Sequence, residues 1–341
     1  MAARAGVDTV RRSIGRLMKT PLERIAITGN AGVYGRALVR AIRGSLPRAS
    51  VLGLDVRPAA ADPPDASWKG DIRDPAAGRI IGEFRPDTVV HLAYAVQPGR
   101  DAATMRSVNV EGTRHVLASA ASCGASRMLV ASSGTVYGAW PDNPPACDEE
   151  APVRPRPEYA YAADKGVVER DVAAFAAAHP QIAVAWTRPA IICGPGVRNF
   201  LSDIFLTVPF LALPDGRDTP LQFVHEDDVA RATLAILSRD ARGPFNIAPE
   251  DSVTQRQIAR AMRIAAVPLP FFVVAAASRV WWTLRLPWVA TPPGLARYLR
   301  HRWVMTSARL TRECGFVFAH SSESAFRTLL EPCPEADDRT A

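Results

Sequence analysis

The strongest constraint on the fold is an alternation, through the first half of the chain, of short apolar runs with segments of helical periodicity. Helical patterns fall near Gly35–Arg43, Met105–Ser122 and Tyr161–Ala178. Strands that alternate with helices predict an α/β fold with a doubly wound parallel sheet, covered by helices on both faces. The apolar runs have the Val, Ile, Leu and Ala content of strands buried on both faces. They are Arg24–Thr28, Ser50–Asp55, Thr88–Leu92, Arg127–Ala131 and Ile182–Thr187.

The character of the chain changes after Arg188-Pro189. Residues 190–222 are punctuated by Gly and Pro, Phe223–Leu237 has the pattern of a short strand and a helix, and Gly243–Ile247 that of a last strand. Residues 252–330 have helical patterns. We therefore predict three parts of the chain. They are a basic extension over 1–20, a nucleotide-binding domain over 21–189 that also takes in about 222–248, and a smaller, mostly helical substrate lobe from 190–221 and 249–341.

Composition and charge exclude several classes of function. The chain of 341 residues is 48% hydrophobic and 22% charged, which is typical of a soluble globular protein. Residues 1–20 carry a net charge of +4, out of +7 for the whole chain. No basic cluster with interleaved aromatic residues follows them, so we expect no nucleic-acid binding. The five cysteines are scattered without a C-x-x-C pair, which argues against disulfides or a zinc site and predicts a reducing, cytoplasmic compartment.

Residues 1–20 form a basic segment with helical periodicity. Apolar side chains recur on one helical face and arginines on the other. Such a helix either lies on a membrane surface or packs on the folded domain, and a non-native leader ahead of a start at Met18 is the third interpretation. The apolar residues are Val7, Val10, Ile14, Leu17 and Met18.

A glycine-rich loop follows the first predicted strand and opens the first predicted helix. Gly29, Gly32 and Gly35 permit a tight turn, a close approach of backbone to a pyrophosphate, and close packing of helix on strand. Asp55 ends the next strand, where a carboxylate binds ribose hydroxyls and repels a 2′-phosphate. The combination predicts a Rossmann-type domain with NAD as its cofactor, and Arg57 keeps NADP as the less favoured alternative.

A tyrosine and a lysine stand four residues apart in Tyr161-Ala-Ala-Asp-Lys165. On a helix, both side chains lie on one face. A cation near a phenol lowers the pKa of a group that ordinarily titrates near ~10, so Tyr161 is a candidate proton carrier at neutral pH. Tyr159 lacks such a partner, because Ala163 follows it at the same spacing.

Together these segments resemble the extended short-chain dehydrogenases/reductases of the NAD-dependent epimerase/dehydratase family over nearly the full chain. The resemblance implies a homodimer formed through the helices near Met105–Ser122 and Tyr161–Ala178. The matching segments, besides the glycine loop and the Tyr-Lys pair, are Asp71-Ile72, His91–Ala95, Asn109–Thr113, Ser132–Gly138, Arg188-Pro189 and Phe223–Ala230.

The resemblance also implies roles for single residues. Ser133 would hydrogen-bond the substrate oxygen, Tyr161 would move the proton, and Lys165 would bind the nicotinamide ribose while lowering the pKa of Tyr161. The remaining implied contacts are all with the cofactor. They are Val33 and Tyr34 at the pyrophosphate, Asp71 and Ile72 at the adenine, and Leu92, Ala93 and Asn109 toward the nicotinamide.

Other polar residues receive structural interpretations. His91 ends a buried strand and is expected to be a satisfied core histidine, and Cys193 has no activating neighbour. Before a helix, Asp227 or Asp228 beside His225 is expected to be an N-cap rather than a metal ligand, and we predict no metal site.

Two hydroxyl residues flank the predicted catalytic serine. Ser132 is expected to cap or pack, because strand-end serines usually bond backbone. Thr135 serves equally as a substrate contact or as part of the turn.

Three departures from the family pattern narrow the function. Gly134-Thr135-Val136 stands where 4,6-dehydratases carry an Asp-Glu pair, which disfavours dehydration. Ile191 and Leu221 stand where nucleotide-sugar epimerases carry an Asn and a phosphate-binding Arg. A buried diphosphate needs such charge-assisted bonds, and Arg198 or Arg217 could substitute for them, although nothing in the sequence requires it.

The C-terminal lobe is unusually apolar for a part that would close over a sugar. Its longest apolar run, Val267–Ala277, is shorter than the ~20 residues that a spanning helix requires, so we predict no transmembrane segment. Core packing is the simplest explanation, and an apolar substrate pocket or a peripheral membrane contact are the alternatives. The apolar residues are Phe271, Phe272, Val273, Val274, Trp281, Trp282, Leu284, Leu286 and Trp288.

The sequence thus predicts an NAD-dependent oxidoreductase that acts on a secondary alcohol or ketone. A nucleotide-sugar 4-epimerase of the UDP-glucose type is the first alternative. A cofactor-binding regulator without turnover is the second, and the retention of Ser133, Tyr161 and Lys165 argues against it.

Overall fold

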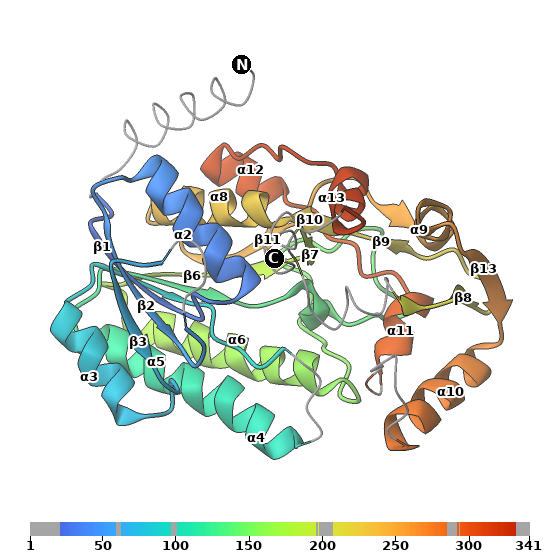
Figure 1. Ribbon diagram of the computed structural model, residues 1–341, viewed down its shortest axis with the longest axis horizontal. Helices are drawn as coiled ribbons and strands as arrows, with labels where there is room; N and C mark the ends of the chain where they lie inside the picture. The colour runs from blue at the N-terminus through green and yellow to red at the C-terminus, as the bar shows by residue number, and fades with distance from the viewer. Residues whose placement is uncertain are drawn as a thin grey trace, which may run out of the picture.

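Seven parallel strands form the central sheet of the protein (Figure 1). The computed structural model describes residues 21–58, 63–96, 101–195, 197, 207–284, 292 and 294–331. The α/β, doubly wound prediction is confirmed, and the predicted extension over 1–20 lies outside the described residues. Across the sheet the order is β11 (Gly243–Ile247), β6 (Ala183–Pro189), β5 (Arg127–Ala131), β4 (Thr88–His91), β1 (Arg24–Thr28), β2 (Ser50–Asp55) and β3 (Ala66–Lys69). The sequence did not predict β3, because an exposed edge strand lacks the apolar run of a buried one.

Helices cover both faces of the sheet (Figure 1). The segment predicted as one helix over 105–122 contains a π-helical turn, η1 (Ser107–Glu111), between two α-helices. One face carries α2 (Val33–Ser45), α8 (Glu226–Leu237) and α12 (Ala308–Cys314); the other carries α3 (Pro75–Phe84), α4 (Ala102–Arg106), α5 (Gly112–Ser122) and α6 (Ala160–Ala178).

The C-terminal lobe combines helices with three two-stranded sheets, and one of their strands comes from the segment 222–248 that we predicted for the nucleotide-binding domain. The strand pairs are β7 (Ile191–Cys193) with β10 (Phe223–His225), β9 (Pro220–Leu221) with β12 (Val253–Thr254), and β8 (Phe210–Pro214) with β13 (Ala265–Leu269). Its helices are α9 (Gln255–Met262), α10 (Phe271–Leu284), α11 (Leu295–Arg300) and α13 (Ser322–Leu329). None of the helices in the described part of the chain is long and apolar enough to cross a membrane.

The strand order places the carboxyl ends of β1 and β4 side by side. Going outward from β1, the chain builds β2 and β3 on one side and β4, β5 and β6 on the other. In doubly wound sheets, ligands bind at the carboxyl ends of the strands where the order reverses. Here that point lies between β1 and β4, so the glycine loop after β1 faces the segment after β4.

A buried ion pair joins α6 to the sheet. Arg188 of β6 and Glu169 of α6 approach to 2.6 Å between Nη2 and Oε2, with side chains 4% and 5% exposed. The indole of Trp186 and the hydroxyl of Ser132 also donate to Glu169, at 3.2 and 2.5 Å. The Arg188 guanidinium donates in turn to the hydroxyl of Tyr137 at 2.7 Å. The carboxylate therefore links α6 with the ends of β5 and β6.

Glu169→Gln should destabilise the protein by about 3–5 kcal/mol, because it leaves the Arg188 charge buried without its counter-ion. Equilibrium denaturation in urea measures the change. The matched control is Glu323→Gln in the exposed pair with Arg327 on α13, which should cost about 0.5 kcal/mol or less. Equal losses in the two variants would contradict the assigned role of the buried pair.

Candidate active site

The glycine loop is packed tightly on its neighbours. It opens toward the point between β1 and β4 where the strand order reverses, which we call the switch point. Gly29 has φ +76°, and a Cβ there would lie 2.5 Å from the Ala93 nitrogen. A Cβ on Gly35 would lie 2.3 Å from the Gly29 oxygen. Gly32 is the N-cap of α2 and makes no side-chain cap, so the first backbone N–H groups of the helix have no capping side chain. An uncapped helix start beside a glycine loop fits an anionic pyrophosphate.

Asp55 joins the end of β2 to the glycine loop. Its carboxylate accepts from the backbone nitrogens of Ala31 and Arg57, both at 3.0 Å. The Arg57 guanidinium lies 3.6 Å from the same carboxylate and is largely exposed. The acid stands where the sequence predicts ribose binding, and the neighbouring cation keeps the NADP alternative open.

The side chains of two other predicted cofactor residues point into the protein. The Tyr34 hydroxyl bonds those of Thr233 and Thr187 at 2.5 and 3.4 Å, so only its backbone is placed to meet a pyrophosphate. Val33, at the first position of α2, is half-buried against the core of the C-terminal lobe.

The predicted adenine contacts lie beside α5. Ile72 is buried, and a Cβ on Gly112 would meet its side chain at 2.6 Å. Asp71 pairs with Arg73 at 2.6 Å, and this hydrogen-bonded partner lowers the pKa of the carboxyl. These contacts stay predictions.

The segment after β4 is held by buried polar groups. Backbone nitrogens of Leu92 and Ala93 donate to Thr28, at 3.0 and 3.3 Å. Asn109 of η1 accepts from the Ala95 nitrogen at 2.8 Å and donates to Asp164 of α6 at 3.3 Å. Asn109 therefore shapes the loop that the cofactor would meet, and a direct contact stays a prediction.

The structure brings Ser133 and Tyr161 together. The Ser133 hydroxyl acts on the Tyr161 phenol and opposes the rise of its pKa on burial. Ser133 also caps the short helix η2 (Gly134–Tyr137) and accepts from the Thr135 hydroxyl at 3.0 Å. Thr135 is thus part of the turn and orients the serine. Ser132 packs as expected, but it bonds the carboxylate of Glu169 rather than backbone, which corrects that detail.

Lys165 lies in a buried cage beside the pair. Its ammonium donates to the Ala131 oxygen at 2.6 Å and sits 3.4 Å from the ring centroid of Tyr94. The Tyr161 ring centroid is farther, at 5.9 Å. Burial lowers the pKa of Lys165 to about 7, although Glu169 opposes the shift.

The expected lowering of the Tyr161 pKa is not found. Burial raises the pKa of Tyr161 to about 12, and the Ser133 hydroxyl offsets this only in part. The helical spacing placed Tyr161 and Lys165 on one face, but it could not show that both groups are removed from water. Desolvation disfavours the charged form of each, so it raises the pKa of the phenol and lowers that of the amine.

Tyr94 is a site residue that sequence reasoning missed. Its ring meets that of Tyr161 edge to face, with centroids 5.4 Å apart at 84°. Its hydroxyl is buried and has no hydrogen-bond partner among the described residues. Burial raises the pKa of Tyr94 well above its usual value, so the phenol stays neutral. The sequence feature that could have identified Tyr94 is its position directly after Ala93, in a segment predicted to line the cofactor.

Leu221 and Ile191, which we predicted to disfavour binding of a diphosphate, lie in apolar surroundings. Leu221 is buried in the core of the C-terminal lobe, and Ile191 packs against the same core. The side chain of Gln222, next to Leu221, hydrogen-bonds backbone groups, including both the oxygen and the nitrogen of Met305. Arg217 is exposed, and Arg198 lies outside the described residues.

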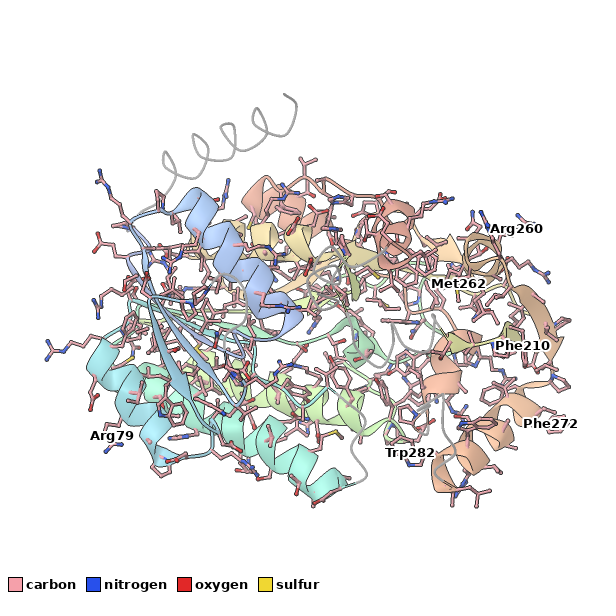
Figure 2. All side chains as sticks on the ribbon, in the orientation of Figure 1. Arg79, Phe210, Arg260, Met262, Phe272 and Trp282 are labelled. Carbon is pink, nitrogen blue, oxygen red and sulfur yellow. The ribbon has the colours of Figure 1, made fainter. Side chains whose placement is uncertain are left out.

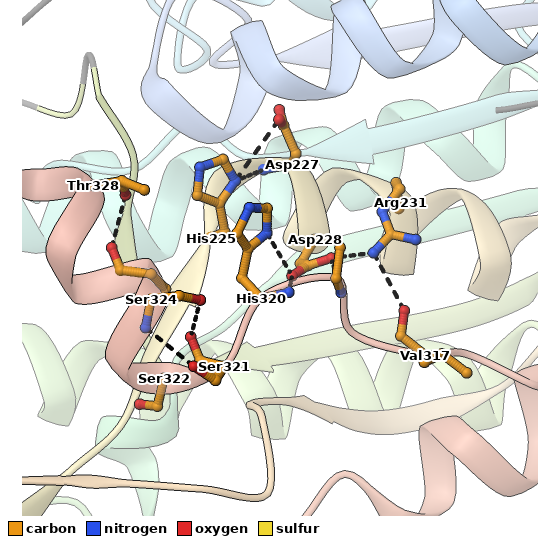
Figure 3. Close-up of polar contacts among 12 residues, drawn as sticks. His225, Asp227, Asp228, Arg231, Val317, His320, Ser321, Ser322, Ser324 and Thr328 are labelled. Carbon is orange, nitrogen blue, oxygen red and sulfur yellow. Dashed lines mark hydrogen bonds and ion pairs between the residues drawn. The ribbon is translucent and has the colours of Figure 1, made fainter. Parts of the chain in front are cut away.

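The His225 cluster is structural (Figure 3). His225, not an aspartate as we expected, caps α8 by accepting from the Asp227 nitrogen at 3.2 Å. Asp228 instead accepts from the backbone nitrogens of Ala319 and His320, both at 3.0 Å, and so fastens the segment before α13. His225 and His320 stack with centroids 4.0 Å apart. No group of three or more potential metal ligands occurs within the described ranges.

The remaining structural interpretations agree with the geometry. His91 bonds the hydroxyls of Thr28 and Thr113 at 2.6 and 2.9 Å, and burial lowers its pKa to about 3. Cys193 is buried, which raises the pKa of its thiol and argues against a nucleophile. Neither side chain has the properties of a reactive group.

Comparisons with known proteins agree with this architecture. The model of a family described as "NAD dependent epimerase/dehydratase family" matches residues 25–248. An uncharacterized protein of Mycobacterium tuberculosis is 31% identical over 60% of the chain, and the chain spans only about half of that relative, 55% of its length. A 3-diazoavenalumate denitrifying reductase of a Streptomyces species is 30% identical over 69% of the chain and 78% of its own length.

A solved structure shares the fold. The UDP-glucose 4-epimerase of Thermotoga maritima, solved with UDP-glucose, superposes with a TM-score of 0.70. The match covers 90% of this chain and 97% of the epimerase, at 19% identity. At that identity, the likeness shows the fold alone.

Lys165→Met should remove a pH dependence of stability. Folded Lys165 has a pKa of about 7, and an unfolded lysine titrates near ~10.4, so the unfolded chain binds more protons between these values. The free energy of unfolding should therefore rise with pH across this window, with a share from Lys165 of about 1.4 kcal/mol per pH unit. Urea denaturation of both proteins from pH 7 to 10 measures this share. Parallel pH profiles would show that the lysine is not desolvated.

Proposed function

Because the chain belongs to the NAD-dependent epimerase/dehydratase family, we propose that it is an NAD-dependent oxidoreductase acting at a secondary alcohol or ketone, with Tyr161 as acid and base. Family membership supports the expectation of an NAD-dependent enzyme. The observation that carries the finer proposal is the placement of Ser133 and the buried Lys165 beside Tyr161. The homodimer and the cytoplasmic location stay predictions.

The residues at the switch point fit the cofactor. The uncapped start of α2 offers backbone N–H groups to a pyrophosphate, and Asp55 offers a carboxylate to ribose hydroxyls. When bound there, NAD supplies the hydride acceptor or donor of the reaction. Gly29 keeps the loop close to the segment that follows β4, and Gly35 keeps the start of α2 close to the loop.

Burial favours a proton-donating role for Tyr161. With its pKa raised to about 12, the phenol is protonated at neutral pH and can donate to a ketone oxygen that Ser133 orients. Lys165, with a pKa of about 7, is partly charged at that pH and stabilises the phenolate that donation leaves. The proposed chemistry therefore has its catalytic groups in the forms that reduction requires.

The surroundings of Leu221 and Ile191 support a substrate without a diphosphate. Both lie in apolar packing, and neither offers a charge-assisted bond to phosphate. A relative named as a reductase supports net redox chemistry. A nucleotide-sugar 4-epimerase is the second candidate, favoured by the fold shared with the UDP-glucose 4-epimerase.

Tyr161→Phe should lower kcat by about 10²–10⁴-fold, because it removes the proton carrier. The absorbance of NADH follows turnover, and the melting temperature checks folding. Tyr159→Phe is the matched control, since this buried neighbour lies 5.6 Å from Tyr161 between ring centroids and has no assigned role in catalysis. Full activity in the Tyr161 variant would overturn the mechanism.

The substrate class is tested by comparing UDP-hexoses with apolar secondary alcohols and ketones. We expect oxidation or reduction of an apolar compound with a stoichiometric change in NADH. UDP-galactose should not be converted, because Leu221 and Ile191 offer no charge-assisted bond to its diphosphate. Its conversion to UDP-glucose without net NADH would establish the epimerase instead.

A further inference from the structure

The outer edge of the C-terminal lobe carries an exposed apolar surface (Figure 2). None of the 14 residues of α10 is buried, although the helix is strongly apolar. Phe272 and Leu284 are 73% and 63% exposed, and Val273 and Val280 are exposed as well. Phe210 on the neighbouring β8 is 41% exposed, and Figure 2 shows it with Phe272 along the same margin. We call these five residues the apolar edge.

The exposed residues of α10 form one stripe. At about 100° per residue, positions 272, 273, 280 and 284 fall within an arc of about 120°. The opposite side of the helix, which includes Phe271 and Ala275, is half-buried against the lobe. The stripe is therefore directed away from the protein rather than scattered around the helix.

α10 is held in this position by its first turn. The Phe271 nitrogen donates to the Asp215 carboxylate at 2.8 Å. The guanidinium groups of Arg300 and Arg297 on α11 lie 4.3 and 5.4 Å from the Phe271 ring centroid. These contacts fix the inner side of the helix and leave its apolar stripe outward.

The segment that contains α10 is basic, and the acids packed beside it are paired with arginines. Residues 252–312 contain ten arginines and neither aspartate nor glutamate. Arg260 and Arg263 on and after α9, and Arg279 at the border of the α10 stripe, are exposed and pair with no carboxylate among the described residues. Figure 2 places Arg260 on the same margin of the lobe as Phe210 and Phe272.

We propose that the apolar edge binds the surface of an anionic lipid bilayer. The α10 stripe enters the boundary between headgroups and acyl chains, and Arg260, Arg263 and Arg279 bind lipid phosphates. An apolar stripe with arginines beside it has the two features that hold a helix in the plane of a membrane. With 14 residues, α10 lies on the bilayer and does not cross it.

Charge favours a bilayer over a second copy of the chain. A symmetric dimer through this edge would bring Arg260, Arg263 and Arg279 of one copy toward those of the other, and none of these arginines pairs with a carboxylate among the described residues. An anionic lipid surface is complementary to both the apolar and the basic parts. This inference is independent of the proposed reaction.

The test is co-sedimentation of the full chain with vesicles of phosphatidylcholine alone or with 30% phosphatidylserine. We expect binding to the anionic vesicles that weakens as salt increases. Phe272→Asp with Leu284→Asp should lower binding at least tenfold, and Arg260→Gln or Arg263→Gln should each lower it about fivefold. The matched controls are Val317→Asp, at a residue 74% exposed elsewhere, and Arg79→Gln on α3; both should bind normally.

Three outcomes would overturn the proposal. They are no binding to the phosphatidylserine vesicles at low salt, equal binding by the Phe272/Leu284 variant, and a concentration-dependent dimer in sedimentation velocity that this variant abolishes. The substituted residues are exposed, so unchanged melting temperatures and unchanged NAD binding would verify that each variant is folded.

Discussion

The buried ion pair between Arg188 and Glu169 is the interaction on which the candidate site depends. Glu169 lies one turn after Lys165 and two turns after Tyr161 on α6, so the pair fixes the rotation of the helix that carries both. Because Ser132 bonds the same carboxylate, the end of β5 and its Ser133 are fixed with it. The buried ion pair thus positions the three catalytic candidates, Tyr161 and Lys165 on α6 and Ser133 after β5. Removing either charge would leave the other buried, which makes this alignment costly to disturb.

The second constraint is the desolvation of the site itself. Tyr161, Lys165 and Tyr94 are packed together, and burial moves the pKa values of the tyrosines upward and that of the lysine downward. A simple charge-pair picture predicts the opposite direction for Tyr161. The environment therefore favours a neutral phenol as proton donor and an amine near its midpoint at neutral pH. These properties follow from the burial of the groups rather than from the four-residue spacing.

Much of the sheet could be predicted, because strands buried on both faces are continuous apolar runs. β1, β2 and β5 occupy the predicted ranges, whereas the exposed edge strand β3 has no such run. For the apolar C-terminal segment, the sequence left three explanations: core packing, a substrate pocket and a membrane contact. Its exposure became visible only when the structure showed which sides of α10 the lobe covers.

The amino-acid sequence by itself determined the local features: the glycine loop before α2, the acid at the end of β2, and the Tyr161–Lys165 spacing on one helix. Each depends on residues close together in the chain, whose geometry follows from helix and strand periodicity. Only the tertiary structure decided that Tyr94 meets Lys165, that Glu169 holds Ser132 and Arg188, and that His225 rather than an aspartate caps α8. Those outcomes depend on contacts between distant segments and on exclusion of water, which no local pattern records.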